Sequence, residues 1–229
     1  MQAIILAGGL GTRLRPLTDS IPKPMISVRG QPFLEHVIRR LAGQGVTDLI
    51  LCVSYRWESI QQHFGDGRQW GVRLRYSVES TPLGTGGAIQ QTAALLEGPF
   101  LVVNGDTYIA IDLPTFLRQA TLGEASLGWL VTYQHPERNN LRVDGAGYVT
   151  AYRPGGHAEM THADAGIGYY HPAVLRWLEP FREPFSWETV VFRRLIAQRL
   201  LCAYVTDTPF YDIGTPERLR TFEASGLPA

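Results

Sequence analysis

The chain has 229 residues, of which 45% are hydrophobic and 18% charged, and this is enough apolar material for one large α/β core. Lys and Arg together number 21 and Asp and Glu 21, so the zero net charge argues against nucleic acid or an anionic membrane as partner. We expect no membrane helix and no signal peptide. Cys52 and Cys202 each lie in an apolar run, which predicts free thiols in the reducing cytoplasm.

Strand and helix patterns alternate along the first half of the chain. Buried strands are expected at residues 3–6, 48–54, 72–78 and 100–103, and helices at 33–42, 57–64 and 87–96. Such alternation predicts βαβ units and a mostly parallel sheet. Ligands of these sheets bind beyond the carboxyl ends of the strands. We therefore expect the segment after Leu6 and the Asp106 side chain after Val103 to lie within reach of each other.

In the second half the turn signals multiply. Helices are expected at 113–120, 187–199 and 217–223, and strands at 126–133, 167–170 and 201–205. The segments His135-Pro136, Asn139-Asn140, Asp144-Gly145 and Pro154-Gly155-Gly156 predict loops and short antiparallel strands over one end of the sheet. No repeat or linker interrupts the chain, so we expect one domain over residues 1–229.

The first strand ends in a glycine-rich turn that basic residues follow. Gly8, Gly9 and Gly11 would expose backbone N–H groups to an anion, with no side chains in the way. Arg13 and Lys23 would add the positive charge that a polyphosphate needs. A tight turn with scattered surface charge is the alternative, but the coincidence of these residues favours a phosphate site.

These residues resemble the sugar-1-phosphate nucleotidyltransferases, or nucleotide-sugar pyrophosphorylases. The family signature is L-A-G-G-x-G-T-R-L followed about ten residues later by P-K-P, and both parts are unbroken here at 6–14 and 22–24. The spacing fits neither the Rossmann dinucleotide fingerprint nor the P-loop. The resemblance implies a single-domain, Rossmann-like (GT-A-like) α/β fold with a mixed, mostly parallel central sheet flanked by helices. It also implies a nucleotide-binding half (about 1–112) and a sugar-binding half with a small antiparallel portion and the C-terminal helix (about 113–229).

Two aspartates occupy positions that suit a divalent metal. Asp106 follows an Asn-Gly turn, and Asp212 stands in the segment 211–216, Tyr-Asp-Ile-Gly-Thr-Pro. Carboxylates are hard ligands suited to Mg²⁺, although aspartate at a strand end is also a common turn or cap residue. The family carries a G-D motif and a C-terminal motif that match these positions. The resemblance implies that Asp106 and Asp212 jointly hold catalytic Mg²⁺ and that Arg13 and Lys23 are the other catalytic residues.

A second glycine-rich turn, at residues 79–89, opens a helix. Its three glycines would let a flat ring or a sugar approach the backbone, although a plain helix start is the alternative. In similar proteins this segment and the first turn frame the nucleotide. The resemblance implies the following nucleotide contacts: Leu6, Ala7, Gly8, Gly9, Gly11, Thr12, Glu79, Gly84 and Thr85.

The sugar side follows the family pattern less closely. Relatives have a Glu-Lys pair whose lysine meets the sugar phosphate, whereas this chain has Tyr152-Arg153, and Arg153 is either its substitute or a solvated turn residue. Asp164 stands where relatives often have the Asn of Asn-Ala-Gly. The resemblance implies sugar-phosphate contacts from Asn104, Arg153, Asp164 and Gly166.

The reaction that the resemblance implies needs positioning and charge neutralisation rather than a covalent intermediate. A sugar 1-phosphate attacks the α-phosphorus of a nucleoside triphosphate, and pyrophosphate leaves. Segments 30–35, 78–89, 103–107 and 183–188 look most like the subfamily that makes GDP-D-glycero-α-D-manno-heptose for bacterial envelope glycans such as lipopolysaccharide or S-layer glycan.

Other functions stay open at this point. A uridylyl- or thymidylyltransferase acting on another sugar 1-phosphate, for example of muramate or hexose type, ranks next after the guanylyltransferase. A non-catalytic regulator that binds nucleotide sugars is the alternative from another class, and it would require a missing catalytic residue. The expected partners are a nucleoside triphosphate, GTP favoured, and a sugar 1-phosphate, and the sequence does not decide between a monomer and a homo-oligomer.

Overall fold

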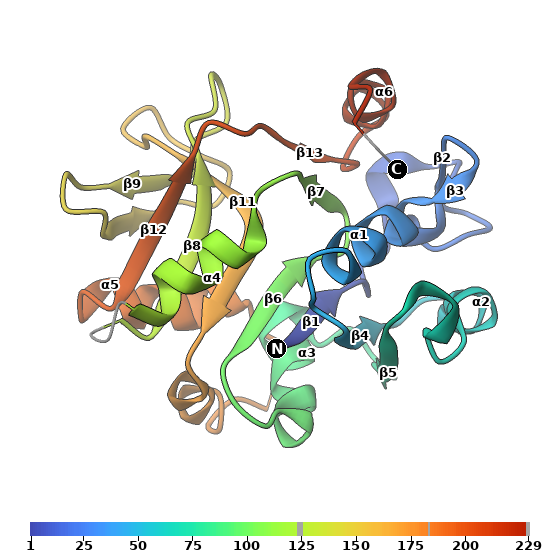
Figure 1. The fold of residues 1–229 in the computed structure, drawn as a ribbon, viewed down its shortest axis with the longest axis horizontal. Coiled ribbons are helices and arrows are strands. Elements are labelled where there is room, and N and C mark those ends of the chain that lie inside the picture. Colours follow the sequence, from blue (N-terminus) through green and yellow to red (C-terminus); the bar gives the residue numbers. More distant parts are fainter. Residues whose placement is uncertain (123–125, 183, 228–229) are drawn as a thin grey trace.

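The computed structural model describes residues 1–122, 126–182 and 184–227, so Glu183 of the 183–188 segment lies outside the described residues. One sheet dominates the described part of the chain, with seven strands in the order β12-β8-β11-β6-β1-β4-β5 (Figure 1). The strands are β1 (Gln2–Leu6), β4 (Asp48–Val53), β5 (Arg73–Val78), β6 (Phe100–Asn104), β8 (Gly128–Tyr133), β11 (Ala163–Tyr170) and β12 (Leu201–Thr206).

The pairing directions confirm a mixed, mostly parallel sheet. β1 runs parallel to both β4 and β6, β4 to β5, and β12 to β8, whereas β11 is antiparallel to β6 and β8. In this register Leu6 lies between Cys52 of β4 and Asn104 of β6. The carboxyl ends of three neighbouring strands therefore meet at one edge of the sheet, where α/β proteins bind ligands.

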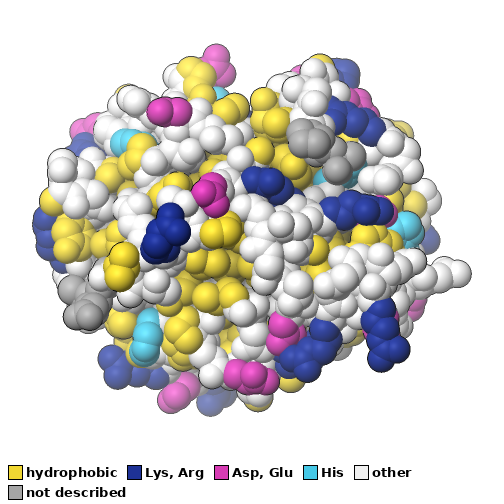
Figure 2. All heavy atoms as spheres, in the orientation of Figure 1, with side chains coloured by type: hydrophobic (Ala, Val, Ile, Leu, Met, Phe, Trp, Pro, Cys, Tyr) yellow, Lys and Arg dark blue, Asp and Glu magenta, His cyan; other side chains and the backbone are white. Residues whose placement is uncertain are grey.

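Helices cover both faces of the sheet. They are α1 (Phe33–Ala42), α2 (Trp57–Phe64), α3 (Gly84–Thr92), α4 (Leu113–Leu122), α5 (Arg193–Ala197) and α6 (Pro216–Ala224). Because successive strand residues point to opposite faces, Ile5 packs into the core under α1, α4 and α6, and Ile4 into the core with α3 and α5. Figure 1 shows α1 and α4 in front of the sheet. Charges of both signs are interspersed over the face in Figure 2.

Short strand pairs and single turns complete the fold. The pairs are β2 (Ser27–Val28) with β3 (Gln31–Pro32), β7 (Thr107–Ile109) with β13 (Phe210–Asp212), and β9 (Leu141–Val143) with β10 (Val149–Tyr152). The turns are η1 (Thr12–Leu14), η2 (Lys23–Met25), η3 (Arg68–Trp70), η4 (Ala93–Leu95), η5 (Pro172–Trp177) and the π-helical turn η6 (Glu188–Phe192).

Three predicted elements differ from the structure by more than one or two residues at an end. The segment 187–199 is not one regular helix, because the widened turn η6 precedes α5 and the chain leaves the helix at Ala197. The strand predicted at 167–170 begins at Ala163 in the structure. A shift in register between Asp164 and Gly168 interrupts the alternation of side chains between the two faces of the sheet, so the sequence pattern did not reveal the first part of the strand. The helix predicted at 87–96 runs from Gly84 to Thr92 and continues as η4.

Cys52 and Cys202 are both buried and unpaired, as the sequence predicts. Among the described residues, the helices are all too short or too polar to reach across a lipid bilayer.

Candidate functional site

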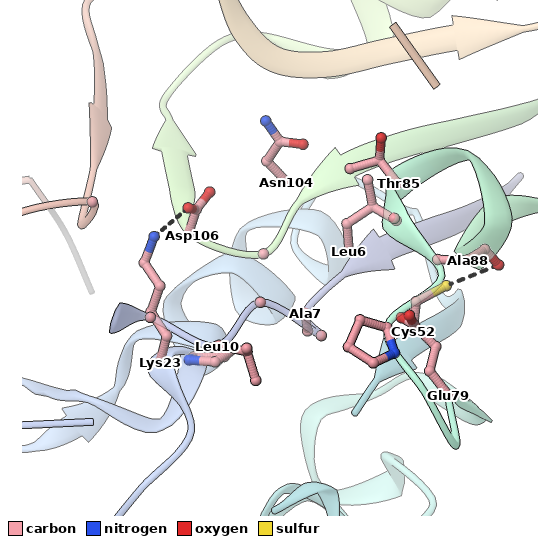
Figure 3. A pocket seen from close by; sticks show the side chains of 18 of the residues that line it. Leu6, Ala7, Leu10, Lys23, Cys52, Glu79, Thr85, Ala88, Asn104 and Asp106 are labelled. Carbon is pink, nitrogen blue, oxygen red and sulfur yellow. Dashed lines mark hydrogen bonds and ion pairs between the residues drawn. The ribbon is translucent and has the colours of Figure 1, made fainter. Parts of the chain in front are cut away.

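A cavity of about 490 Å³ opens where β1, β4 and β6 end. Figure 3 shows Lys23 and Asp106 at one end of it, Glu79 and Cys52 at the other, and Leu6 and Ala7 between. The cavity is large enough for a small-molecule ligand. Its lining contains the first glycine-rich turn and parts of the second: Leu6, Ala7, Gly8, Gly9, Leu10, Gly11, Thr12, Arg13, Lys23, Pro24, Cys52, Glu79, Pro82, Gly84, Thr85, Ala88, Asn104, Gly105, Asp106, Glu188 and Gly214.

The first glycine-rich turn is fixed by backbone contacts to neighbouring strands. The Ala7 N–H donates to the carbonyl of Cys52, and the Gly105 N–H donates to the carbonyl of Leu6. Gly11 has φ +63°, and a Cβ there would lie 2.9 Å from Thr18 Cγ2 and 3.0 Å from Lys23 Cβ. Only glycine fits this position without strain. The turn thus brings its backbone to the cavity and places Lys23 beneath it.

Lys23 and Asp106 form an ion pair at one end of the cavity. The ammonium of Lys23 donates to Oδ2 of Asp106, and the other carboxylate oxygen accepts a bond of 3.1 Å from the Thr107 hydroxyl. The Lys23 side chain is only 9% exposed, against 37% for that of Asp106. A nearly buried ammonium faces a carboxylate that is still open to the cavity.

Lys23 is also the only lysine of the chain, because the other 20 of its 21 Lys and Arg residues are arginines. An ammonium is a compact point charge that fits where a planar guanidinium would not. A single lysine in a nearly buried cavity position therefore agrees with a specific role for Lys23.

Asp212 lies next to Asp106 in the fold but faces other partners. β13 places Asp212 opposite Thr107 of β7, and the Ile213 N–H donates to the carbonyl of Asp106 over 3.0 Å. The Asp212 carboxylate, 14% exposed, is bound by Arg138 at 2.8 Å and Arg218 at 3.1 Å. Asp212 lines a smaller cavity of about 220 Å³, whereas Gly214 lines the larger one.

The surroundings of Asp212 act on its acidity in opposite directions. Burial raises the pKa of Asp212, but bonds from Arg138, the Gly214 N–H and Arg218 outweigh burial and lower its pKa below the ordinary value. Sequence reasoning missed both arginines. Arg138 lies 74 residues from Asp212 and follows a turn signal with no pattern of its own, so no local feature could reveal the contact.

The donor set of the two aspartates fits a divalent cation that also binds substrate. Within the described ranges, no three His, Cys, Asp or Glu side chains cluster as a complete protein-built metal site. Mg²⁺ commonly uses one or two carboxylates and takes its other ligands from phosphates and water. Asp106 is 37% exposed, with its two oxygens held by Lys23 and the Thr107 hydroxyl, whereas Asp212 would first have to release an arginine.

Glu79 presents a carboxylate at the other end of the cavity. Its Oε2 accepts a bond of 2.9 Å from the Leu83 N–H, and its Oε1 faces the first turn, where a Cβ on Gly8 would approach it to 2.7 Å. Burial raises the pKa of Glu79, although the bond from Leu83 opposes this effect. A hydrogen-bond acceptor therefore closes the end of the cavity opposite Lys23.

The glycines of the second turn make room for a side chain of the protein itself. A Cβ on Gly84 would lie 2.5 Å from the Phe185 carbonyl oxygen, and a Cβ on Gly86 would lie 2.2 Å from the Phe185 ring. The Gly86 N–H donates to that same carbonyl. The close approach expected for a ligand ring is thus made at these two positions by Phe185. Gly84 and Thr85 still line the cavity.

The predicted sugar-side residues do not all reach the cavity. Asn104 lines it, and Gly166 packs against Asn104, where a Cβ would lie 3.1 Å from the amide nitrogen. Arg153 is exposed and does not line the cavity, and its backbone N–H donates to the Asn140 carbonyl. Asp164 also lies outside the lining and binds the Gly166 N–H, and burial raises its pKa to about 7.

Glu188 is a cavity residue that sequence reasoning did not single out. It stands at the start of η6, and its Oε2 accepts bonds from the hydroxyls of Thr85 and Ser186. In the sequence, segment 183–188 stands out only because it resembles the subfamily that makes GDP-heptose. Glu188 and Thr85 belong to segments about 100 residues apart, so their meeting could not be inferred from spacing.

Comparison with known proteins agrees with this geometry. Residues 2–225 match the family model described as nucleotidyl transferase. A D-glycero-alpha-D-manno-heptose 1-phosphate guanylyltransferase of Aneurinibacillus thermoaerophilus is 32% identical over 222 residues, 96% of each chain. A protein of the same name from Campylobacter jejuni is 34% identical over 95% of this chain and 96% of its own. The crystal structure of HddC from Yersinia pseudotuberculosis complexed with GMP-PN has a TM-score of 0.82 at 30% identity and covers 96% of both chains. The chain belongs to the nucleotidyl transferase family.

Proposed function

We propose that this protein transfers the guanylyl group of GTP to D-glycero-α-D-manno-heptose 1-phosphate and releases pyrophosphate. The observation that carries the proposal is the nearly buried Lys23 paired with Asp106 at one end of a glycine-lined cavity. The names of the relatives with 32% and 34% identity support the choice of base and sugar. The product would serve envelope glycan synthesis, and we place the reaction in the cytoplasm, where nucleoside triphosphates are made.

The first half of the chain, about residues 1–112, would bind and activate GTP. The N–H groups of residues 9–12 and the exposed Arg13 hold the triphosphate, and Arg13 has no acidic partner within the described residues. Lys23 neutralises charge that develops on the α-phosphate in the transition state. The sugar-phosphate oxygen attacks the α-phosphorus, the bond from this phosphorus to the β-phosphate breaks, and pyrophosphate carries away the bonding electrons.

Asp106 and Asp212 would hold Mg²⁺, which supplies charge neutralisation between the nucleotide phosphate and the sugar phosphate. Asp106 lines the cavity and its side chain is 37% exposed, so its carboxylate is accessible to the cation. The carboxylate donor chemistry supports this assignment.

Glu79 supports guanine as the base. A carboxylate only accepts hydrogen bonds, and guanine presents two neighbouring donors, N1–H and N2–H₂. Uracil and thymine offer one ring N–H, whereas adenine and cytosine place a ring nitrogen acceptor there. Oε1 of Glu79 faces the first glycine-rich turn, and Oε2 is held by the Leu83 N–H, so this carboxylate matches guanine best.

The second half, about residues 113–229, would complete the sugar site. Glu188 and Asn104 line the cavity and present acceptor and amide groups that suit sugar hydroxyls. Gly166 packs against Asn104 and donates its N–H to Asp164, and neither Gly166 nor Asp164 lines the cavity. We assign the sugar-reading role to Glu188 and Asn104.

The test is pyrophosphate release in the presence of Mg²⁺. The four common ribonucleoside triphosphates and dTTP are each combined with the 1-phosphates of D-glycero-α-D-manno-heptose, mannose, glucose and N-acetylmuramate. We expect GTP with the heptose phosphate to give the highest kcat/KM. Turnover only with UTP or dTTP would overturn the choice of base, and binding of nucleotide with no turnover in any combination would overturn the catalytic function.

A further inference from the structure

Asp212 is neutralised by two arginines that reach it from different parts of the fold. Arg138 belongs to the loop between β8 and β9, and Arg218 lies on α6. Their side chains are 33% and 36% exposed, so both keep contact with solvent while binding a carboxylate that is 14% exposed. One carboxylate with two guanidinium partners is over-compensated, which makes one arginine dispensable for charge balance.

The two carboxylate oxygens are held in different ways. Oδ1 accepts the Gly214 N–H at 2.9 Å and Arg218 at 3.1 Å, both from within six residues of Asp212. Oδ2 takes its shortest bond, 2.8 Å, from Arg138. Its other contact, with Arg218, is 3.4 Å long. The local partners thus orient Asp212, whereas Oδ2 depends on a distant loop.

Arg138 has alternative contacts that would keep it in place without Asp212. Its Nε and Nη2 lie 3.2 Å and 3.0 Å from Nε2 of His135, and its guanidinium carbon lies 5.7 Å from the Phe210 ring centre. These groups line the smaller cavity of about 220 Å³ together with Arg138. The guanidinium therefore has both room and partners when it leaves Oδ2.

We propose that Arg138 is a displaceable counter-ion of Asp212, which surrenders Oδ2 when a divalent cation binds there. The inference rests on the proposed metal role of Asp212. In this proposal the cation takes the oxygen that Arg138 now holds, so Arg138 and the cation compete for it. Arg138 is thus a positioning residue: it keeps the carboxylate neutralised and oriented, and it sets the metal affinity below what the two aspartates alone would give.

The loop that carries Arg138 also contacts the sugar half. The Asn140 side chain accepts the Asp164 N–H over 2.9 Å, and its carbonyl accepts the Arg153 N–H. Displacement of Arg138 from Asp212 would therefore act on a loop that is joined to Asp164 and Arg153. Through this loop, the competition between Arg138 and the cation would affect the part of the chain that binds the second substrate, the sugar 1-phosphate.

The test is Mn²⁺ binding to the whole protein, measured from the paramagnetic resonance signal of free Mn²⁺ with Mn²⁺ alone as the probe. We expect R138Q to bind Mn²⁺ about tenfold more tightly than the wild type, a size typical of coupling between two ligands of one site. R138M, whose apolar stem still packs on Phe210, should show the same gain. The matched control is R142Q, which removes an exposed arginine paired with Glu159, and it should bind as the wild type does.

The variant D212N separates this proposal from the function on which it rests. D212N should lose the Mn²⁺ affinity gained in R138Q when the two changes are combined. If D212N alone binds Mn²⁺ like the wild type, both the metal role of Asp212 and the competition are wrong. If D212N weakens binding but R138Q and R138M bind equally well or more weakly than the wild type, Arg138 does not compete and the metal role stands.

Discussion

Replacing Lys23 by methionine tests the charge at the reacting phosphate. The substitution keeps the length of a side chain that is 9% exposed and removes its ammonium. Two unit charges about 4 Å apart interact by about 4 kcal/mol at an effective dielectric constant of about 20. If Lys23 meets transition-state charge with this strength, kcat falls about 10³-fold, because each 1.36 kcal/mol is a factor of about ten in rate.

The assay is the initial rate of pyrophosphate release at saturating GTP and sugar 1-phosphate. The matched control is Arg15→Met, a neighbouring cation that is 67% exposed and pairs with Asp19, and it should retain activity within about threefold, as expected for an exposed pair. A kcat for K23M within tenfold of the wild type, in a folded protein, would refute the role of Lys23.

The presence of one lysine allows a direct measurement of the same residue. Reductive methylation with ¹³C-formaldehyde labels the Lys23 amine and the N-terminus only, because the chain has no other lysine. The Lys23 methyl signal should shift when GTP is added, because the triphosphate brings negative charge to the ammonium. If the Lys23 methyl signal keeps its chemical shift at saturating GTP, the triphosphate binds away from Lys23.

Three further variants test other parts of the account. In base selection, the wild type should favour GTP over ITP, which lacks the 2-amino group, by about tenfold in kcat/KM. The variant E79Q should reduce this preference to about threefold or less. An unchanged preference in E79Q would contradict the reading of the base by Glu79. In stability, burial raises the pKa of Asp164 to about 7, so folding disfavours its carboxylate and the wild type loses stability as pH rises from about 4 to 7. D164N should match the wild type at pH 4 and exceed it by about 4 kcal/mol at pH 8 in urea unfolding, because a rise of about three in the pKa corresponds to this free energy. Parallel curves for the two proteins would refute the reasoning. In packing, a Cβ on Gly86 meets the Phe185 ring at 2.2 Å, so G86A should lower the free energy of unfolding by about 1–3 kcal/mol, whereas G98A, with open space around it, should not; equal stability of the two variants would exclude the clash.

Local patterns predicted the first half of the fold well. The helix expected at 33–42 has these same bounds in the structure, and the strands before Leu6 and Asn104 pair in register as the alternation of strands and helices requires. Parallel strands then force Gly8 and Asp106 to the same edge, so the core of the cavity followed from sequence order alone.

The remaining parts depend on contacts between distant segments. Arg138 meets Asp212 across 74 residues, and Glu188 meets Thr85 across 103. Neither contact has a periodicity or spacing that a local pattern could reveal. The bulged start of β11 and the widened turn η6 broke the regular periods on which the strand and helix predictions relied.

The most direct measurement is the ³¹P NMR spectrum of one mixture of the protein, Mg²⁺, GTP and D-glycero-α-D-manno-heptose 1-phosphate. The account predicts that the GTP and sugar phosphate signals decay together while the two coupled phosphorus signals of GDP-heptose and the signal of pyrophosphate grow in equal amounts. A spectrum in which GTP decays to GMP or GDP while the heptose phosphate signal stays constant would contradict nucleotidyl transfer to this sugar.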